Sequence, residues 1–484
     1  MRSLRGKIYL PLAIAFSIGA GLRLAVMVAV YPAIYFGWDL IRYARIWPRN
    51  LFEDCWMPAG YPFILQILRG ISNQIALVIT LQHFAGLGVG LFGFALARRL
   101  GAPRPVAVAT ALPALLSGDL LFIEHAVATE PFFNFLLAAS LVAVATGITR
   151  RSMTALALGS CLLGLSTLVR SIATVLPLAF ALGVIFALWR SPRLCLRALA
   201  IAVVPAVVIV RAYAAIVTSI GGFPGLTEMN GFYLYSRVAP VADCARFRPP
   251  KRAEVLCETR PASKRPGPFF YGGSEESPSR RHFEVPGALY GIFTMDPRNN
   301  ALFREFALGA VTHQPLDYVH EVAVDLGRYF VPSLDQRAWI AWGPEYYDFR
   351  ADKLWTGESF LEGLLSNRYQ GTQIHRRRVL LGIVGAYASF VRLNGAVLAL
   401  TLVGSLVGIA LTRNPAMRGV LILLLSTGAA LLVVPVLVSS YDYRYGFPAQ
   451  VPLGWAAVLG GWTAVSRWRH RTASTTSPKA EPLE

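Results

Sequence analysis

The sequence predicts an all-α polytopic membrane protein with about ten transmembrane helices. Of its 484 residues, 55% are hydrophobic and only 15% are charged. A soluble protein of this length would carry about a quarter charged residues. Several apolar runs reach the roughly 20 residues that cross a bilayer, and the clearest are 8–30, 198–219 and 418–438.

Apolar runs near membrane length set the expected helices. In chain order they are 8–30, 75–97, 104–120, 130–148, 153–171, 172–189, 198–219, 393–412, 418–438 and 449–466. Basic residues precede the first run, as they do in a signal peptide. That run is longer than the roughly 7–15 residues of a signal-peptide core and no A-x-A cleavage site follows, so we expect a retained helix.

Arginine in the connecting loops predicts the orientation. One set of short loops has no Asp or Glu and carries Arg98, Arg99 and Arg104; Arg150 and Arg151; Arg190, Arg193 and Arg197; and Arg413 and Arg418. The stretches 2–7 and 467–471 are basic as well. By the positive-inside rule all of these lie in the cytoplasm. The protein is therefore expected in the cell membrane with both termini cytoplasmic.

This orientation divides the chain into four parts. They are an N-terminal transmembrane module, 1–219, with a first external loop at 32–74; an extracytoplasmic insertion, 220–377; C-terminal transmembrane helices, 378–467; and a cytoplasmic tail, 468–484. The tail is small and polar, which predicts disorder. Juxtamembrane helices are expected in the first external loop.

The insertion is expected to be mostly helical. Up to about residue 298 it is rich in Pro, Gly and charge, which indicates irregular surface structure. Beyond that, apolar residues recur at helical spacing on both sides of Pro315. This spacing predicts two amphipathic helices on the membrane rim or over a cavity. Cys244 and Cys257 share this external segment, where disulfides persist, and are predicted to pair.

The formal net charge of +19 suggests nucleic acid as a partner, but the sequence argues against it. The basic residues sit in short loops between apolar runs, where the positive-inside rule accounts for them. No basic face is interleaved with aromatic residues of the kind that grips single strands. We expect the bilayer, and no nucleic acid, as a partner.

Charges near a membrane are costly unless they are paired or functional. The most informative segment has Asp39 just beyond the first span, Tyr43 four residues later, and a Pro-Gly-Tyr-Pro turn within 58–62. Asp also serves well as a helix N-cap, so a cap followed by a loop is the alternative.

Four segments together resemble the glycosyltransferase C superfamily. They are Asp39 with Tyr43, Ala44 and the Pro58–Pro62 turn; Thr129-Glu130; Gly164-Leu165 to Arg170; and Tyr443-Arg444-Tyr445 followed by Pro448 and Pro452. More narrowly, they resemble bacterial phospholipid-carrier-dependent members, related to protein O-mannosyltransferases and lipid A aminoarabinose transferases. The likeness covers 8–190 and 440–465 and is thin across 220–377.

The resemblance implies a function and a set of site residues. In such enzymes the first-loop carboxylate, here Asp39, is catalytic, and Glu130 is carried over as a second catalytic residue. Arg170, Arg444 and Tyr445 would bind the phosphate of a polyprenyl-phosphate-linked sugar, which is passed to an unidentified acceptor on the extracytoplasmic side. Module 1–219 would then be the catalytic one. Leu40 follows Asp39 where some members have Asp-Glu, which puts a second carboxylate role there in doubt.

Other residues are weaker candidates. They are Tyr43, Tyr61, Asp119, Glu124 and His125. His and carboxylates bind divalent metals, so the last two with Glu130 could hold one. A hydrogen-bonded structural pair is favoured for them, and no metal site or cofactor is predicted. Arg23 and Arg211 interrupt spans and are expected to snorkel or to bond carbonyl groups.

The alternative function is a transporter or flippase of a lipid-linked substrate. Transporters tend to show repeated halves and helices broken near the midplane. The sequence has no such repeat, and its acidic residues lie at the outer rim. The enzymatic interpretation is therefore preferred.

Overall fold

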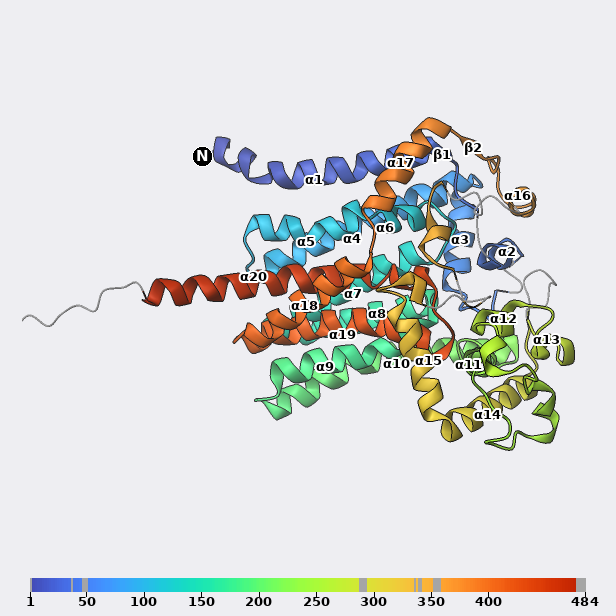
Figure 1. Ribbon diagram of the computed structural model, residues 1–484. Helices are drawn as coiled ribbons and strands as arrows, with labels where there is room; N and C mark the ends of the chain where they lie inside the picture. Colours follow the sequence, from blue (N-terminus) through green and yellow to red (C-terminus); the bar gives the residue numbers. More distant parts are fainter. Residues whose placement is uncertain are drawn as a thin grey trace, which may run out of the picture.

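The computed structural model describes residues 2–35, 38–45, 51–286, 294–334, 337, 342–350 and 358–475. Helices dominate this part of the chain (Figure 1). Its strands are β1 (Val30–Tyr31) and β2 (His375–Arg376), which pair antiparallel and join the end of the first long helix to the end of the insertion. The predicted all-α membrane class is confirmed.

Long helices form a bundle with roughly parallel axes (Figure 1). They are α1 (Arg2–Ala29), α4 (Ile75–Arg99), α5 (Arg104–Leu116), α7 (Glu130–Arg150), α8 (Met153–Val169), α9 (Leu176–Leu188), α10 (Pro192–Gly221), α18 (Gly395–Leu411), α19 (Pro415–Val438) and α20 (Gln450–Thr475). The N-terminal end of α1 and the C-terminal end of α20 lie at one end of this bundle, and the insertion lies at the other.

Within the described residues, six helices are long and apolar enough to cross a membrane, or eight if each of two bent pairs counts as one span. Two of the ten expected runs are not among these eight candidate spans. One forms α8, which has only 17 residues. The other forms α20, whose Gly and Trp residues lower its hydropathy. Because Leu453, Trp455 and Leu459 of α20 are fully buried, this helix packs mainly against protein.

Two expected spans are bent. The run 104–120 becomes α5 and the short helix α6 (Gly118–Glu124), at 51° to each other. The run 393–412 forms α18, which is preceded at 43° by α17 (Arg378–Phe390). Gly118 N–H donates to the carbonyl of Val391 at 2.7 Å. The two breaks therefore pack on each other.

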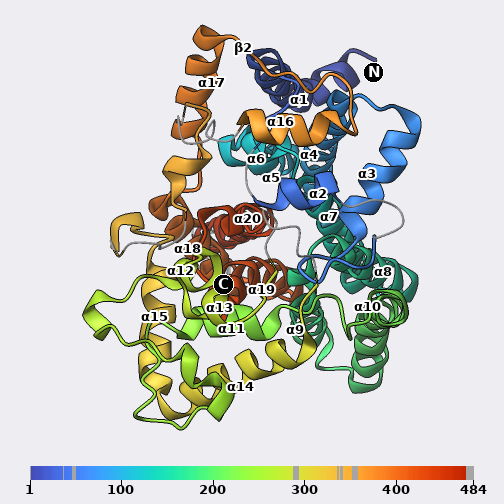
Figure 2. The ribbon, with the colours of Figure 1, turned by 90° about the vertical axis from the view of Figure 1, so that its right-hand side faces the viewer.

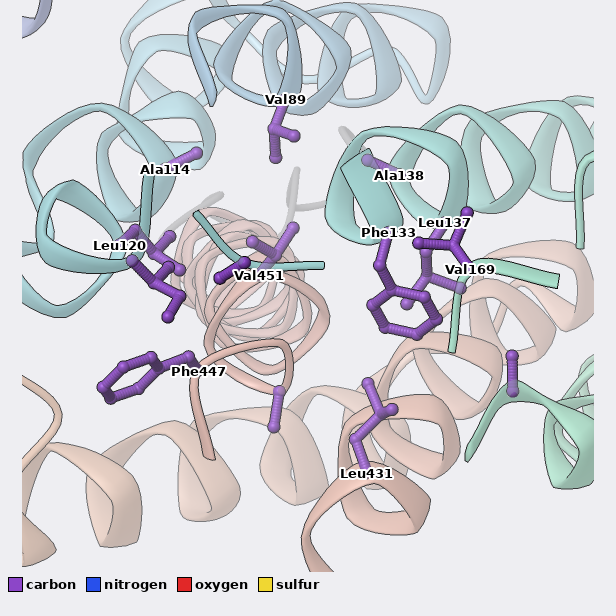
Figure 3. Close-up of a cluster of buried hydrophobic side chains, with 14 of the residues drawn as sticks. Val89, Ala114, Leu120, Phe133, Leu137, Ala138, Val169, Leu431, Phe447 and Val451 are labelled. Atoms are coloured by element: carbon purple, nitrogen blue, oxygen red, sulfur yellow. The ribbon is translucent and has the colours of Figure 1, made fainter. Parts of the chain in front are cut away.

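Apolar side chains fill the interior of the bundle, next to the end that carries the insertion. Val451 of α20 lies among side chains from four other helices: Val89 (α4), Ala114 (α5), Leu120 (α6) and Phe133 (α7) (Figure 3). All five belong to one buried cluster that extends through the bundle. The elements that carry the polar site are thus fixed on a packed core.

The insertion has its own helices and its own apolar core. They are α11 (Asn230–Val238), α12 (Pro268–Gly273), α13 (Pro278–His282), α14 (Pro297–His313), α15 (Pro315–Gly327) and α16 (Glu358–Ser366). The two helices expected around Pro315 are α14 and α15. Phe232, Tyr235, Phe303 and Phe306 pack together between α11 and α14. A disulfide joins Cys244 to Cys257, the pair expected from the sequence.

Shorter elements complete the end of the molecule that carries the insertion, and this end faces the viewer in Figure 2. The first external loop contains the expected juxtamembrane helices, α2 (Trp38–Arg45) and α3 (Gly60–Ile71). The 3-10 helices are η2 (Ser171–Val175), η3 (Lys251–Leu256), η4 (Ala262–Lys264), η6 (Pro332–Leu334), η7 (Pro344–Tyr347) and η9 (Tyr443–Gly446). At the opposite end α20 continues to Thr475, so residues 468–475 of the expected disordered tail are helical; 476–484 lie outside the described residues.

Candidate active site

A cavity of about 300 Å³ opens where α2, η2, α11, η9 and the C-terminal end of α19 meet. Its polar lining includes Asp39, Thr129, Arg170, Arg444 and Tyr445. These residues come from four distant stretches of the sequence. The four segments that carry the family resemblance therefore each lie in or beside this one place.

Asp39 lies in the first turn of α2, where a carboxylate interacts favourably with the helix dipole. Its Oδ2 accepts a hydrogen bond from Arg444 Nη2 at 2.9 Å. The Asp39 side chain is 30% exposed and that of Arg444 is 14% exposed. The carboxylate is thus held in place and is also accessible from the cavity.

A buried ion pair anchors α2 to the loop that follows it. Arg42 Nε donates to Asp54 Oδ2 at 2.8 Å, and both side chains are about 2% exposed. The Arg42 guanidinium also lies over the ring of Trp56, 5.1 Å from its centroid. Because Arg42 is three residues from Asp39, this pair sets the position of the Asp39 carboxylate.

Glu130 lies behind the two cavity arginines. Its Oε1 forms an ion pair with Arg170 Nη1 and lies 3.4 Å from Arg444 Nε, and its side chain is 0% exposed. Arg170 Nη1 also donates to the hydroxyl of Thr129 at 3.0 Å. One buried carboxylate thus holds both guanidinium groups, and their remaining N–H groups are left for other partners.

Arg444 is fixed by its own backbone as well. Asp442 Oδ1 accepts from Arg444 N at 2.9 Å and from the Tyr347 hydroxyl at 2.7 Å. Burial raises the pKa of Asp442, although the Arg444 charge and the Tyr347 hydrogen bond oppose this rise. Because Tyr347 belongs to η7, the last part of the insertion contacts the segment that carries Arg444.

Three tyrosines predicted from the sequence lie in or near the cavity. Tyr43 and Tyr445 line it. The ring of Tyr61 packs edge-on against Tyr43, with centroids 4.8 Å apart, and its hydroxyl donates to Gln82 Oε1 at 2.9 Å. Burial, and then the negative charge of Asp442, raise the pKa of Tyr445 to about 12. Tyr445 is therefore a neutral hydrogen-bond donor at ordinary pH.

Asp119 is not part of the cavity. It is buried at the start of α6, where Oδ2 accepts from Leu393 N and Gln450 Nε2, each at 2.8 Å, and from the Tyr443 hydroxyl at 3.1 Å. These bonds tie the break between α17 and α18 to η9 and α20. Its role here is structural, because its described partners occupy it fully.

Glu124 and His125 form a separate buried network. Glu124 Oε1 accepts from Arg23 Nη2 at 2.8 Å, and Glu124 Oε2 lies 3.0 Å from His83 Nδ1. His83 Nε2 lies 3.1 Å from His125 Nδ1. The expected hydrogen bond between Glu124 and His125 is therefore not formed: Glu124 bonds Arg23 and His83, and His83 lies between it and His125. Sequence spacing could not identify these partners.

Arg23 also donates to the carbonyls of Gly19 and Ala114, each at 3.0 Å, so it bonds carbonyl groups as expected. Arg211 is exposed on the surface of α10. Among the described residues, no group of three or more His, Cys, Asp or Glu side chains is arranged to hold a metal ion.

The cavity also has an apolar side and an aromatic one. Val175 of η2 and Leu431, Val434, Pro435 and Val438 of α19 supply the apolar lining. Trp56 and Tyr233, with ring centroids 5.5 Å apart, supply the aromatic lining. Tyr233 comes from α11, in the part of the chain where the family resemblance is thin, so no motif pointed to it.

No protein-family model and no curated protein sequence matches the chain. Solved structures that are similar to it include the following three. An archaeal oligosaccharyltransferase, AglB from Archaeoglobus fulgidus, in complex with an inhibitory peptide and a dolichol-phosphate, is 14% identical with a TM-score of 0.41. The alignment covers 99% of this chain and 53% of AglB. A second Archaeoglobus fulgidus structure, tethered to an acceptor peptide, is 12% identical with a TM-score of 0.39 and coverage of 97% and 54%.

The third is ArnT from Cupriavidus metallidurans bound to undecaprenyl phosphate. It is 18% identical, with a TM-score of 0.36, and the alignment covers 99% of this chain and 82% of ArnT. The chain spans about half the length of the two archaeal proteins. At these identities and TM-scores the similarities do not assign an activity, and the site geometry has to support the function.

Proposed function

We propose that the protein is a membrane glycosyltransferase of the glycosyltransferase C type. It moves a sugar from a polyprenyl-phosphate donor to an acceptor on the extracytoplasmic side, with Asp39 as the catalytic carboxylate. One observation carries the proposal: an accessible carboxylate and two arginines line the same cavity, which also has an apolar lining.

In the proposed reaction, the carboxylate and the two arginines of the cavity have separate roles. Asp39 accepts the proton of an acceptor hydroxyl as the hydroxyl oxygen bonds to the anomeric carbon of the donor sugar. The bond from that carbon to the phosphate oxygen breaks, and the phosphate leaves with the electron pair. Arg170 and Arg444 stabilise the negative charge that develops on the phosphate.

The two linings of the cavity match the two halves of such a donor. The apolar residues of α19 and η2 suit a polyprenyl chain. Arg170, Arg444 and the neutral hydroxyl of Tyr445 suit its phosphate. Trp56 and Tyr233 offer aromatic surface of the kind that packs on sugar rings. The acceptor would enter beneath the insertion, from which Tyr233 comes.

Glu130 is assigned a positioning role in place of the catalytic role that the resemblance implies. Its carboxylate is fully buried and bonded to both arginines. It therefore cannot reach substrate without releasing them. Its negative charge keeps two like-charged guanidinium groups side by side, ready for a phosphate.

Conversion of lipid-linked sugar tests the proposal. The purified protein, reconstituted in membranes from a strain that lacks it, should consume a polyprenyl-phosphate sugar and form a new glycosidic bond, both followed by mass spectrometry. Asp39→Asn should reduce the rate by about 10²–10⁴-fold, the usual contribution of a general base.

A matched control separates chemistry from folding. Asp317 is an exposed carboxylate of α15 paired with Arg246, so Asp317→Asn should leave the rate unchanged. Full activity of a folded Asp39→Asn protein would remove the catalytic assignment. Movement of the lipid across sealed vesicles with no new glycosidic bond would indicate a transporter.

A further inference from the structure

A second cavity lies far from the candidate active site, at the arginine-rich end of the bundle. It is a groove of about 530 Å³ between the C-terminal end of α18, the N-terminal end of α19 and the side of α20. It forms because α18 ends at Leu411 while α20 continues to Thr475. Figure 1 shows α20 extending beyond its neighbours at this end.

The polar side of the groove is cationic and rich in hydroxyl groups. On α20, Thr463, Ser466 and Arg467 line it from one helix face, since they are three and four residues apart. Arg467 donates to the carbonyl of Leu411, which holds its guanidinium at the groove. Arg413, in the loop before α19, is exposed and also lines the groove.

Among the residues that the structure describes, no acidic side chain lines the groove, and the short loops at this end contain Arg without Asp or Glu. A negatively charged ligand would therefore meet two guanidinium groups and the hydroxyl residues Thr412, Thr463 and Ser466. Arginine presents its N–H groups in a fork that matches two phosphate oxygens.

An apolar stripe leads away from this cationic pocket along α18. Leu400, Val403, Val407 and Leu411 follow one another at spacings of three and four residues, so they share one face. The first three are 72%, 56% and 42% exposed, and Leu411 lines the groove together with Trp462. A ligand here can place a charged group on the arginines and a hydrocarbon chain on the stripe.

We infer that this groove binds one anionic phospholipid of the leaflet opposite the candidate active site. Its phosphate would lie between Arg413 and Arg467, and an acyl chain would lie along α18. Charge complementarity and the adjoining apolar stripe both select a lipid, because a free phosphate ion would make no use of the stripe. The inference does not depend on the proposed catalytic function.

Tryptophan quenching tests the site on the full-length protein. The protein is placed in phosphatidylcholine nanodiscs that contain increasing fractions of brominated phosphatidylglycerol or, separately, brominated phosphatidylcholine. Fluorescence quenching should saturate at a lower fraction of phosphatidylglycerol. Trp462→Phe should remove this saturable component, since Trp462 is the indole that lines the groove.

Charge variants locate the headgroup. Arg413→Gln should raise the phosphatidylglycerol fraction needed for half-quenching about fivefold, the effect of one basic residue near an anionic surface. Arg193→Gln is the matched control: Arg193 is exposed in the first turn of α10, at the same end of the bundle, and does not line the groove. Equal quenching by the two lipids would overturn the inference. So would equal losses from the two variants, because that result would indicate general surface attraction.

Discussion

Arg444 connects the two carboxylates of the candidate site. It donates to Asp39 through Nη2 and faces Glu130 through Nε. A planar guanidinium presents its donors on separate nitrogens in a rigid fork, so it can serve two carboxylates at once. In the proposed reaction a donor phosphate would compete with Asp39 for this arginine, which would free the carboxylate to accept a proton.

Arg444→Lys should therefore reduce sugar transfer although the positive charge is kept. An ammonium group carries its three donors on one nitrogen, whereas Arg444 reaches Asp39 and Glu130 through two separate nitrogens, Nη2 and Nε. The loss should be about 10²–10³-fold in kcat, as for removal of one preorganised donor. Arg298→Lys, at an exposed arginine of α14, is the control. Near-normal turnover of Arg444→Lys would show that charge alone suffices there.

Glu130→Ala should destabilise the protein, in contrast to Asp39→Asn. Removing one member of a buried ion pair costs about 3–5 kcal/mol, and Glu130 supports two arginines. The partly exposed pair of Asp39 and Arg444 contributes at most about 1 kcal/mol. Thermal unfolding in detergent should show a large fall in Tm for Glu130→Ala only. Equal Tm values for the two variants would contradict a positioning role for Glu130.

For single residues, sequence motifs located the site better than residue type alone could have done. Asp39, Arg170 and Arg444 were identified by motifs, and the structure brings them to one cavity. Asp119 and Glu124 carry the same chemistry but are engaged by distant partners, Gln450 and Arg23. A linear sequence does not show which carboxylates are already occupied.

At the scale of elements, the two bent helix pairs contact each other at their breaks. Gly118 begins α6 against the backbone of Ala388 in α17. A Cβ added at Gly118 would lie only 2.4 Å from the Ala388 Cα, nearer than side-chain atoms pack. Glycine is therefore needed for the two bent pairs to touch.

Gly118→Ala should lower stability by about 1–3 kcal/mol, the usual cost of overpacking a tight contact. Gly21→Ala in α1 is the control, because nothing lies within 4 Å of the Cβ that it would add. Its effect should be neutral or slightly stabilising, as expected for Ala in a helix. The comparison is made by thermal unfolding, and similar Tm values for both variants would refute the close-contact argument.

Helical periodicity predicted these elements well where they are long or amphipathic, as for α7 and for α14 with α15. It did not predict the bends. The run 104–120 was expected as one helix although Ser117, Gly118 and Asp119 interrupt it, and α17 lies before the expected run 393–412. The central position of α20 was also not visible from hydropathy. Gly408 of α18 meets Gly460 of α20 backbone to backbone, a contact that only the fold defines.

For the whole molecule, we propose that the insertion end faces away from the cytoplasm, as the arginine-rich loops predict. Asp317→Cys in the insertion and Arg193→Cys in the first turn of α10, at the other end, test this orientation. A membrane-impermeant maleimide should label Asp317→Cys in intact cells. Arg193→Cys should react only after permeabilisation. The reverse pattern would invert the proposed topology.

The central claim is that Asp39, Arg170 and Arg444 form one site for a lipid-linked sugar. The most direct measurement is a cryo-EM map of the protein with a polyprenyl-phosphate sugar bound. Density for the phosphate should lie between Arg170 and Arg444, with the chain along α19 and the anomeric carbon facing Asp39. Donor density elsewhere on the molecule, with this cavity empty, would contradict it.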